Sequence, residues 1–249
     1  MNIKKTFGLV GYPLTHSFSK KYFTEKFSRE NIDAQYELFE LDRLDKLPDL
    51  FSKRELEGLN VTIPYKEKII PLLNELDIVA KQTGAVNCIK ITHEGGKTKT
   101  MGFNTDVYGF KQSLKPFLES KHERALILGT GGASKAVAHV LKEIGIDYLF
   151  VSRNPSGSNI ISYDQLNDHI IQNHLIIINS TPLGMYPGID RYPSLPYSAL
   201  SSNHLLYDLI YNPDETPFLK KGKEKGATTL NGLSMLHLQA EKSWEIFNS

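Results

Sequence analysis

The chain has 249 residues, with 29 Lys and Arg against 28 Asp and Glu, and a single cysteine, Cys88. This length allows one large domain or two small ones. The near-neutral charge argues against a nucleic-acid binder that neutralises phosphates, and one cysteine excludes an intramolecular disulfide and a cysteine-built zinc site. Because no run approaches the roughly 18 apolar residues of a membrane span, and the first residues lack the apolar core of a secretion signal, we expect a cytoplasmic protein.

Short β-branched runs alternate with helical patterns along the chain. The predicted strands are residues 7–10, 36–39, 58–63, 86–91, 125–128, 148–151, 175–178, 205–209 and 228–230. The predicted helices are residues 17–30, 42–53, 74–82, 106–118, 132–144, 215–225 and 233–247. The glycine pair Gly95-Gly96 predicts a hairpin between residues 86–91 and 97–102. The alternation as a whole predicts an α/β fold with mostly parallel sheets.

A glycine-rich turn follows the predicted strand 125–128 and opens the next helix. It reads Gly129-Thr130-Gly131-Gly132-Ala133. In this context the backbone can approach a pyrophosphate closely, and the helix N-terminus stabilises its negative charge. The simple pattern has a third glycine where Ser134 stands, so an ordinary tight turn remains the alternative. The turn predicts a dinucleotide site.

The next predicted strand leads into Ser152-Arg153-Asn154. An acidic residue at such a strand end holds a ribose hydroxyl of NAD, whereas an arginine there favours the 2′-phosphate of NADP. Positions 152 to 154 hold no Asp or Glu. We therefore predict NADP rather than NAD, with Arg153 in a fork-like phosphate contact. The alternative is a solvated arginine at a strand end.

Four polar segments lie at predicted strand ends. They contribute Ser17 and Ser19, then Asn60, Thr62 and Lys66, then Asn87, and finally Asp106. Taken singly, each has a structural explanation, such as a helix cap for Ser17 or a first-turn carboxylate for Asp106. Because ligands of open α/β sheets bind outside the carboxyl ends of strands, the four segments together predict a binding site.

Eight segments extend these observations over nearly the whole chain. In order they are GYPLTHSFS, GLNVTIPYK, GAVNC, GFNTDVYGF, GTGGAS, NSTPLGM, YDLIYNPDETPFL and NGLSMLHLQA. With them the chain resembles the shikimate dehydrogenase family, NADP-dependent enzymes that reduce 3-dehydroshikimate in chorismate and aromatic amino-acid biosynthesis. The resemblance implies a substrate domain of residues 1–105 plus 233–249 and a Rossmann-like NADP domain of residues 106–232, with a cleft between them.

The resemblance also implies roles for individual residues. Ser17 and Ser19 would hold the substrate carboxylate, and further polar groups would fix the ring hydroxyls: Asn60, Thr62, Asn87, Asp106, Tyr211 and Gln239. Lys66 would protonate or stabilise the developing oxyanion, while Asp106 orients Lys66. The NADP site would comprise Gly129, Thr130, Gly131, Gly132, Ala133, Ser152, Arg153, Asn154, Thr181, Met185, Leu209 and Gly232. No metal is expected.

Two departures from the family pattern bear on these expectations. Residues 155–158 lack the second arginine that the family often has, so the preference for NADPH is expected to be modest. Cys88 replaces a common threonine and is expected to be a small core residue. Two alternatives remain: a quinate/shikimate dehydrogenase that accepts NAD, and a catalytically silent binding or regulatory relative. The expected partner is the small-molecule substrate, without nucleic acid or membrane, in a monomer or a homodimer.

Overall fold

The structure, a computed structural model, describes residues 4–14, 17–53 and 55–249. It divides into two compact units, Met1–Thr105 with Ala240–Ser249, and Asp106–Gln239. The predicted assignment of one domain to the substrate and one to the cofactor, with its boundaries, stays a prediction. Thr15 and His16 of the first motif lie outside the described residues.

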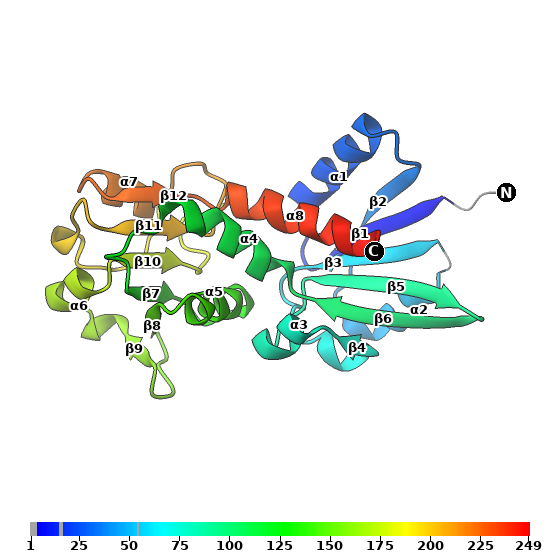
Figure 1. Cartoon of the computed structure of the whole chain (residues 1–249), viewed down its shortest axis with the longest axis horizontal. Helices are drawn as coiled ribbons and strands as arrows, with labels where there is room; N and C mark the ends of the chain where they lie inside the picture. The colour runs from blue at the N-terminus through cyan, green and yellow to red at the C-terminus, as the bar shows by residue number, and fades with distance from the viewer. Residues whose placement is uncertain (1–3, 15–16, 54) are drawn as a thin grey trace. The chain divides into compact units, whose positions relative to one another are not determined.

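The first unit contains a mixed sheet (Figure 1). Within the described residues its strand order is β2-β1-β3-β5-β6-β4. The strands are β1 (Lys5–Gly11), β2 (Ala34–Glu40), β3 (Leu56–Val61), β4 (Glu75–Leu76), β5 (Cys88–Glu94) and β6 (Lys97–Phe103). β1 is parallel to β2 and β3, whereas β3, β5 and β6 run antiparallel in turn. Gly95 and Gly96 both have positive φ, so the predicted hairpin turn is confirmed.

Short helices connect these strands: α1 (Phe18–Arg29), α2 (Leu47–Phe51) and α3 (Ile78–Thr83). The predicted helix 74–82 is wrong in its first turn. Asn74 accepts a hydrogen bond from the Thr100 amide at 2.8 Å and thereby holds β4 beside β6. Asp77 then caps α3 by accepting from the Ala80 amide at 2.7 Å. The helix therefore begins after the cap.

The last helix, α8 (Leu233–Phe247), completes the core of the first unit with its final turns. Phe7 lies 5.3 Å from Trp244 and 5.1 Å from Phe247, measured between ring centroids. Lys26 of α1 is 6% exposed and forms an ion pair with Glu241 at 2.9 Å. The apolar stripe predicted from residues 233–247 thus packs its C-terminal part on β1 and α1.

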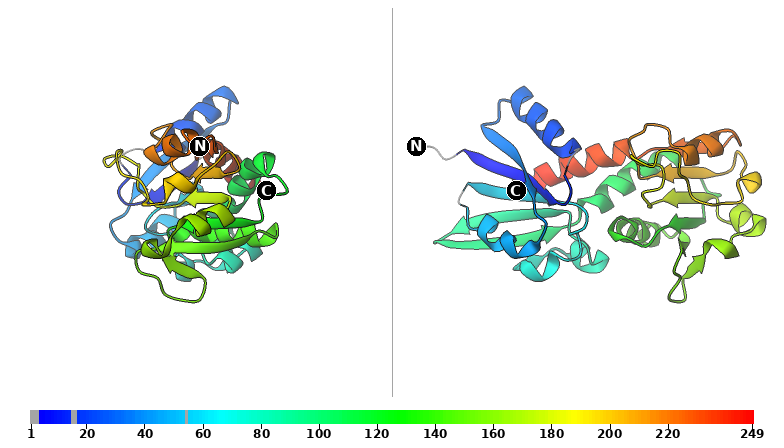
Figure 2. Two further views of the ribbon diagram at one scale, coloured as in Figure 1. Left: turned by 90° about the vertical axis from the view of Figure 1, so that its left-hand side faces the viewer. Right: turned by 180° about the vertical axis from the view of Figure 1, so that it is seen from behind.

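The second unit contains a parallel sheet with strand order β12-β11-β10-β7-β8-β9 in the part of the chain that the structure describes (Figures 1 and 2). The strands are β7 (Arg124–Leu128), β8 (Asp147–Ser152), β9 (Ile160–Ser162), β10 (Ile176–Asn179), β11 (Leu205–Asp208) and β12 (Thr228–Leu230). Every neighbouring pair in it is parallel. The predicted α/β class with mostly parallel sheets is confirmed.

Helices α4 (Thr105–Leu114), α5 (Gly132–Glu143), α6 (Asp168–Asn173) and α7 (Pro217–Lys223) belong to this part of the chain. The prediction missed β9 and α6, which are short and lack a clear periodicity. α4 ends before the predicted residue 118, because the chain tightens into a 3-10 turn at Lys115–Phe117 around Pro116. Strand order reverses between β7 and β10, and such a reversal is where open α/β sheets bind ligands. Among the described residues, no helix combines the length and the apolar character needed to cross a membrane.

Candidate functional site

The predicted carboxylate ligands lie at the start of α1, which follows the carboxyl end of β1. Ser17 is the N-cap, and its Oγ accepts a hydrogen bond from the Lys20 amide at 3.2 Å. Ser17 therefore caps the helix, which is the structural role that the sequence predicts as the alternative to ligand binding. Capping uses the oxygen as an acceptor and leaves the O–H as a donor. Ser19, in the first turn, is half-buried. Two hydroxyl donors at a helix N-terminus suit an anion.

Thr62 and Lys66 follow the carboxyl end of β3. The Thr62 methyl group packs on Gly11 of β1, where any side chain would overlap it: an added Cβ would lie 2.4 Å from the Thr62 Cγ2. Lys66 is half-buried, and its carbonyl oxygen accepts from the Val86 amide at 2.7 Å. This bond fixes the turn that carries the lysine to the segment that carries Asn87.

Asn60 and Asn87 are both buried, at 5% and 3% exposure. The Asn60 Nδ2 donates to the Ser243 Oγ at 2.9 Å and to the Asn87 carbonyl at 3.3 Å. The Asn87 Oδ1 accepts from the Thr105 amide at 2.7 Å. The structure therefore brings Asn87 against the residue that precedes Asp106. Direct contact of either asparagine with a substrate stays a prediction.

Asp106, Tyr211 and Gln239 belong to the second unit. Asp106 is 5% exposed in the first turn of α4, where the helix dipole favours a carboxylate. Gln239 is also buried, and its Nε2 donates to the Leu236 carbonyl at 3.0 Å. Gly109 of α4 lets the backbone of α8 approach closely, because an added Cβ would lie 2.6 Å from the Met235 carbonyl oxygen. Tyr211 is half-buried, and burial raises the pKa of its phenol.

The glycine turn has the predicted strand-turn-helix context, between β7 and α5. Gly129 has φ +102°, which favours glycine, and an added Cβ would lie 3.0 Å from the Ser180 Oγ. An added Cβ at Gly131 meets nothing within 4 Å, so this side of the turn is open. Ser134, in place of a third glycine, is fully buried and donates to the Gly131 carbonyl at 2.6 Å. Its hydroxyl therefore folds onto the turn and leaves the helix N-terminus accessible.

The end of β8 carries the predicted phosphate contact. Ser152 accepts a hydrogen bond from the Asn154 amide at 3.2 Å, which shapes the turn. Arg153 is exposed, and no carboxylate pairs with it among residues 4–14, 17–53 and 55–249. An unpaired guanidinium beside the glycine turn fits a phosphate group.

A group of buried hydrogen bonds around Asp208, at the ends of β10 and β11, was not predicted from the sequence. Asp208 accepts from the Asn179 Nδ2 at 3.0 Å, the Thr216 hydroxyl at 2.6 Å and the Ile210 amide at 3.1 Å. Asn179 in turn accepts from the Thr181 hydroxyl at 2.6 Å. These bonds fix the loops that carry the predicted cofactor residues Thr181 and Leu209. The sequence did offer one sign of it, because Asp208 is an acidic residue at the end of the predicted strand 205–209.

Gly232 packs against the loop that carries Leu209. Its amide donates to the Ile210 carbonyl at 2.9 Å, and an added Cβ would lie 2.1 Å from the Leu209 carbonyl oxygen. No side chain fits in that space. Met185, at the end of the Thr181 loop, is 45% exposed. Whether these residues line a nicotinamide stays a prediction.

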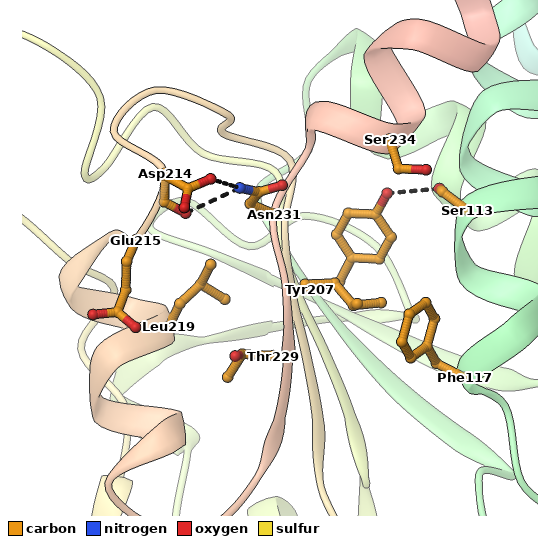
Figure 3. Close-up of a pocket in the computed structure, with 10 residues that line it drawn as sticks. Ser113, Phe117, Tyr207, Asp214, Glu215, Leu219, Thr229, Asn231 and Ser234 are labelled. Atoms are coloured by element: carbon orange, nitrogen blue, oxygen red, sulfur yellow. Dashed lines mark hydrogen bonds between the residues drawn. The ribbon is translucent and has the colours of Figure 1, made fainter.

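A cavity of about 370 Å³ lies elsewhere in the second unit (Figure 3). It is lined by Ser113, Phe117, Tyr207, Asp214, Glu215, Leu219, Thr229, Leu230, Asn231 and Ser234. The figure shows the Tyr207 hydroxyl directed at Ser113 and the Asn231 amide directed at Asp214. Two carboxylates without a lining Lys or Arg are unsuited to a dinucleotide phosphate. The glycine turn is the better site for one.

Comparison with known proteins identifies the family. Residues 9–89 match the family model described as the shikimate dehydrogenase substrate binding domain. Shikimate dehydrogenase (NADP(+)) of Carboxydothermus hydrogenoformans is 38% identical, over 97% of this chain and 90% of that protein.

The chain belongs to the shikimate dehydrogenase family.

Two solved structures extend the comparison. Shikimate 5-dehydrogenase from Thermus thermophilus, in complex with NADP(H) and shikimate, is 28% identical with a TM-score of 0.84, covering 98% of this chain and 93% of that chain. Quinate dehydrogenase from Corynebacterium glutamicum, in complex with NAD, is 26% identical with a TM-score of 0.87 and the same coverage. Because shikimate and quinate dehydrogenases share this fold, the choice between them depends on individual residues.

The buried Asp208 makes the stability of this family member depend on pH. Burial raises the pKa of Asp208 to about 6, against the hydrogen bonds from Thr216, Ile210 and Asn179, which lower it. The ordinary value is 3.8, so between about pH 4 and 6 the folded chain keeps a proton that the unfolded chain releases. The contribution of Asp208 to stability is therefore present below about pH 4 and is lost as the pH rises through 6.

Replacing Asp208 by asparagine should remove this dependence, because the amide carries no charge. Its oxygen can still accept from Asn179 and Ile210, and its NH2 group can donate to the Thr216 hydroxyl, which then becomes the acceptor. The free energy of unfolding of Asp208→Asn, relative to the unmodified protein, should rise by up to about 3 kcal/mol between pH 4 and pH 7. Urea unfolding followed by far-UV circular dichroism at both pH values measures the difference. A difference that stays constant with pH would contradict the assignment.

Proposed function

We propose that this chain catalyses the reversible NADPH-dependent reduction of 3-dehydroshikimate to shikimate, in the pathway to chorismate and the aromatic amino acids. The observation that carries the proposal is 38% identity, over 97% of the chain, to a shikimate dehydrogenase (NADP(+)). The motifs by which the chain resembles the family include both proposed catalytic residues, Lys66 and Asp106, which argues against a silent relative. A cytoplasmic location is part of the same proposal.

The residues of the second unit fit NADP. The open side of the turn at Gly131, the N-terminus of the 12-residue helix α5 and the exposed Arg153 offer the contacts that a pyrophosphate and a 2′-phosphate require. We assign the pyrophosphate to Gly129–Ala133 and the 2′-phosphate to Ser152, Arg153 and Asn154. Thr181, Met185, Leu209 and Gly232 are assigned to the nicotinamide side. When bound, NADPH supplies the hydride for the ketone carbon.

The first unit and α4 supply the remaining chemistry. Reduction of a ketone leaves negative charge on its oxygen, which needs stabilisation and a proton at the same place. We assign this role to the Lys66 ammonium, with the Asp106 carboxylate orienting it and accepting a hydrogen bond from a ring hydroxyl. Ser17 and Ser19 bind the substrate carboxylate as neutral donors. Thr62, Asn87, Tyr211 and Gln239 are assigned to ring hydroxyls.

The test is an oxidation assay with the purified full chain, followed by the absorbance of reduced nicotinamide. Four reactions are compared: shikimate or quinate, each with NADP or NAD. The expected result is the highest kcat/KM for shikimate with NADP. A higher kcat/KM for quinate with NAD would establish the alternative dehydrogenase, and no reaction with any pair would establish a silent relative.

A further inference from the structure

A chain of buried hydrogen bonds runs through the first unit and ends on Asn87, a predicted substrate-binding position. We call it the buried network, and its members are Tyr36, Asn60, Ser243 and Thr105. Each member is at most 5% exposed, and they come from β2, β3, α8 and the start of α4. It ends on Asn87, which is assigned to a ring hydroxyl.

Asn60 is the centre of the buried network. Both hydrogens of its Nδ2 are used within the protein, by the Ser243 Oγ and the Asn87 carbonyl. Its Oδ1 accepts from the Tyr36 hydroxyl at 2.8 Å. A donor on one side and two acceptors on the other fix the orientation of the amide. Asn60 therefore acts on its protein neighbours, whereas the motif alone assigned it to the substrate.

Tyr36 holds Asn60 from the opposite side. Burial raises the pKa of the Tyr36 phenol well above its ordinary value. The phenol therefore keeps its proton and donates it to the Asn60 Oδ1.

Ser243 connects Asn60 to Thr105 and, through it, to Asn87. Its Oγ lies 3.1 Å from the Thr105 Oγ1, and the Ser243 side chain is fully buried. Thr105 holds the Asn87 side chain at both ends, because its amide donates to the Asn87 Oδ1 at 2.7 Å and its Oγ1 accepts from the Asn87 Nδ2 at 2.9 Å. Thr105 also precedes the proposed catalytic Asp106.

We propose that Tyr36 and Ser243 are positioning residues for shikimate, which fix the placement of Asn87 through Asn60 and Thr105 without contacting the substrate. The proposal rests on the proposed function. In a buried, low-dielectric setting an unmade hydrogen bond is costly, so the buried network has one favourable arrangement. That arrangement holds the Asn87 side chain in place before shikimate arrives, which lowers the cost of ordering it on binding.

Two variants test the proposal. Tyr36→Phe removes one buried hydroxyl and no carbon atom, and Ser243→Ala removes the acceptor for Asn60 and the link to Thr105. Each is expected to raise the KM for shikimate about 5- to 20-fold, as loss of a buried hydrogen bond implies. The KM for NADP should stay within about twofold, because the buried network lies outside the unit that carries the glycine turn.

Ser113→Ala is the matched control. Ser113 is also a buried helix serine, and its hydroxyl bonds to a second hydroxyl, that of Tyr207, at 2.6 Å. Its hydroxyl bonds to the Phe110 carbonyl and to Tyr207, and neither is a proposed substrate residue, so the KM for shikimate should not change. The double variant of Tyr36 and Ser243 should lose less than the product of the single losses, because both act through Asn60.

The outcomes separate this proposal from the proposed function. A selective rise in the shikimate KM, absent from Ser113→Ala, supports the positioning role. An unchanged shikimate KM, or an equal rise in both KM values, overturns it. If Ser243→Ala does not fold, as judged by circular dichroism, Tyr36→Phe decides the question alone. If the unmodified protein does not oxidise shikimate with NADP, the proposed function fails instead.

Discussion

Lys66→Ala is expected to lower kcat for shikimate oxidation about 100-fold or more. The substitution removes the only group that we assign to stabilise and protonate the substrate oxygen. It should leave NADP binding nearly intact, because the proposed cofactor residues lie in the other unit. Initial rates measure kcat, and quenching or enhancement of NADPH fluorescence on titration measures cofactor binding.

Lys68→Ala is the control for this prediction. Lys68 is exposed and lies two residues further along the same turn, so the variant changes the local charge equally. Its kcat should match that of the unmodified protein. A small loss of kcat in Lys66→Ala, or an equal loss in both variants, would remove Lys66 from the catalytic assignment.

Arg153→Ala is expected to lower kcat/KM for NADPH about 10- to 100-fold and to leave kcat/KM for NADH nearly unchanged. A charge-assisted hydrogen bond from the guanidinium to the 2′-phosphate is lost, and NADH has no such phosphate. Because residues 155–158 contain no second arginine, no neighbouring guanidinium replaces the lost contact. The ratio of the two kcat/KM values in 3-dehydroshikimate reduction is the measurement.

Arg124→Ala supplies the matched comparison. Arg124 is exposed at the first residue of β7, the amino end of the strand, whereas cofactors of this fold bind at the carboxyl ends. Its removal should lower neither value. If Arg153→Ala retains the full preference for NADPH, the basis of that preference lies in another residue.

The sequence allowed prediction of the α/β class and of the long elements because both leave a regular pattern. Strand β12 was predicted at its observed bounds, and α8 likewise. The short elements β4 and β9 were not predicted. β4 exists because Asn74 bonds to Thr100, which is 26 residues away in the chain. A contact of this kind leaves no local periodicity.

The residues of the candidate site likewise fall into those that the sequence predicted and those that it did not. The motifs predicted the residues that we assign to a ligand, such as Lys66 and the glycine turn. They did not predict Asp208, Ser243 and Tyr36, because each of these forms a buried hydrogen bond with a residue 24 or more positions away in the chain. Asn60 illustrates the difference: it shares a motif with Thr62, yet its amide hydrogens bond to Ser243 and Asn87. Only the folded arrangement distinguishes the two roles.

The compact unit that begins the chain is completed by residues 240–249, which the ribosome adds after the entire second unit. Until then Phe7 lacks Trp244 and Phe247, and Gly58 lacks the Phe247 ring that fills the space of its missing side chain. Residues 106–239 are contiguous and can fold during synthesis, whereas the N-terminal segment must wait with apolar surface exposed. Chaperone dependence during translation is therefore expected to concentrate in the first hundred residues.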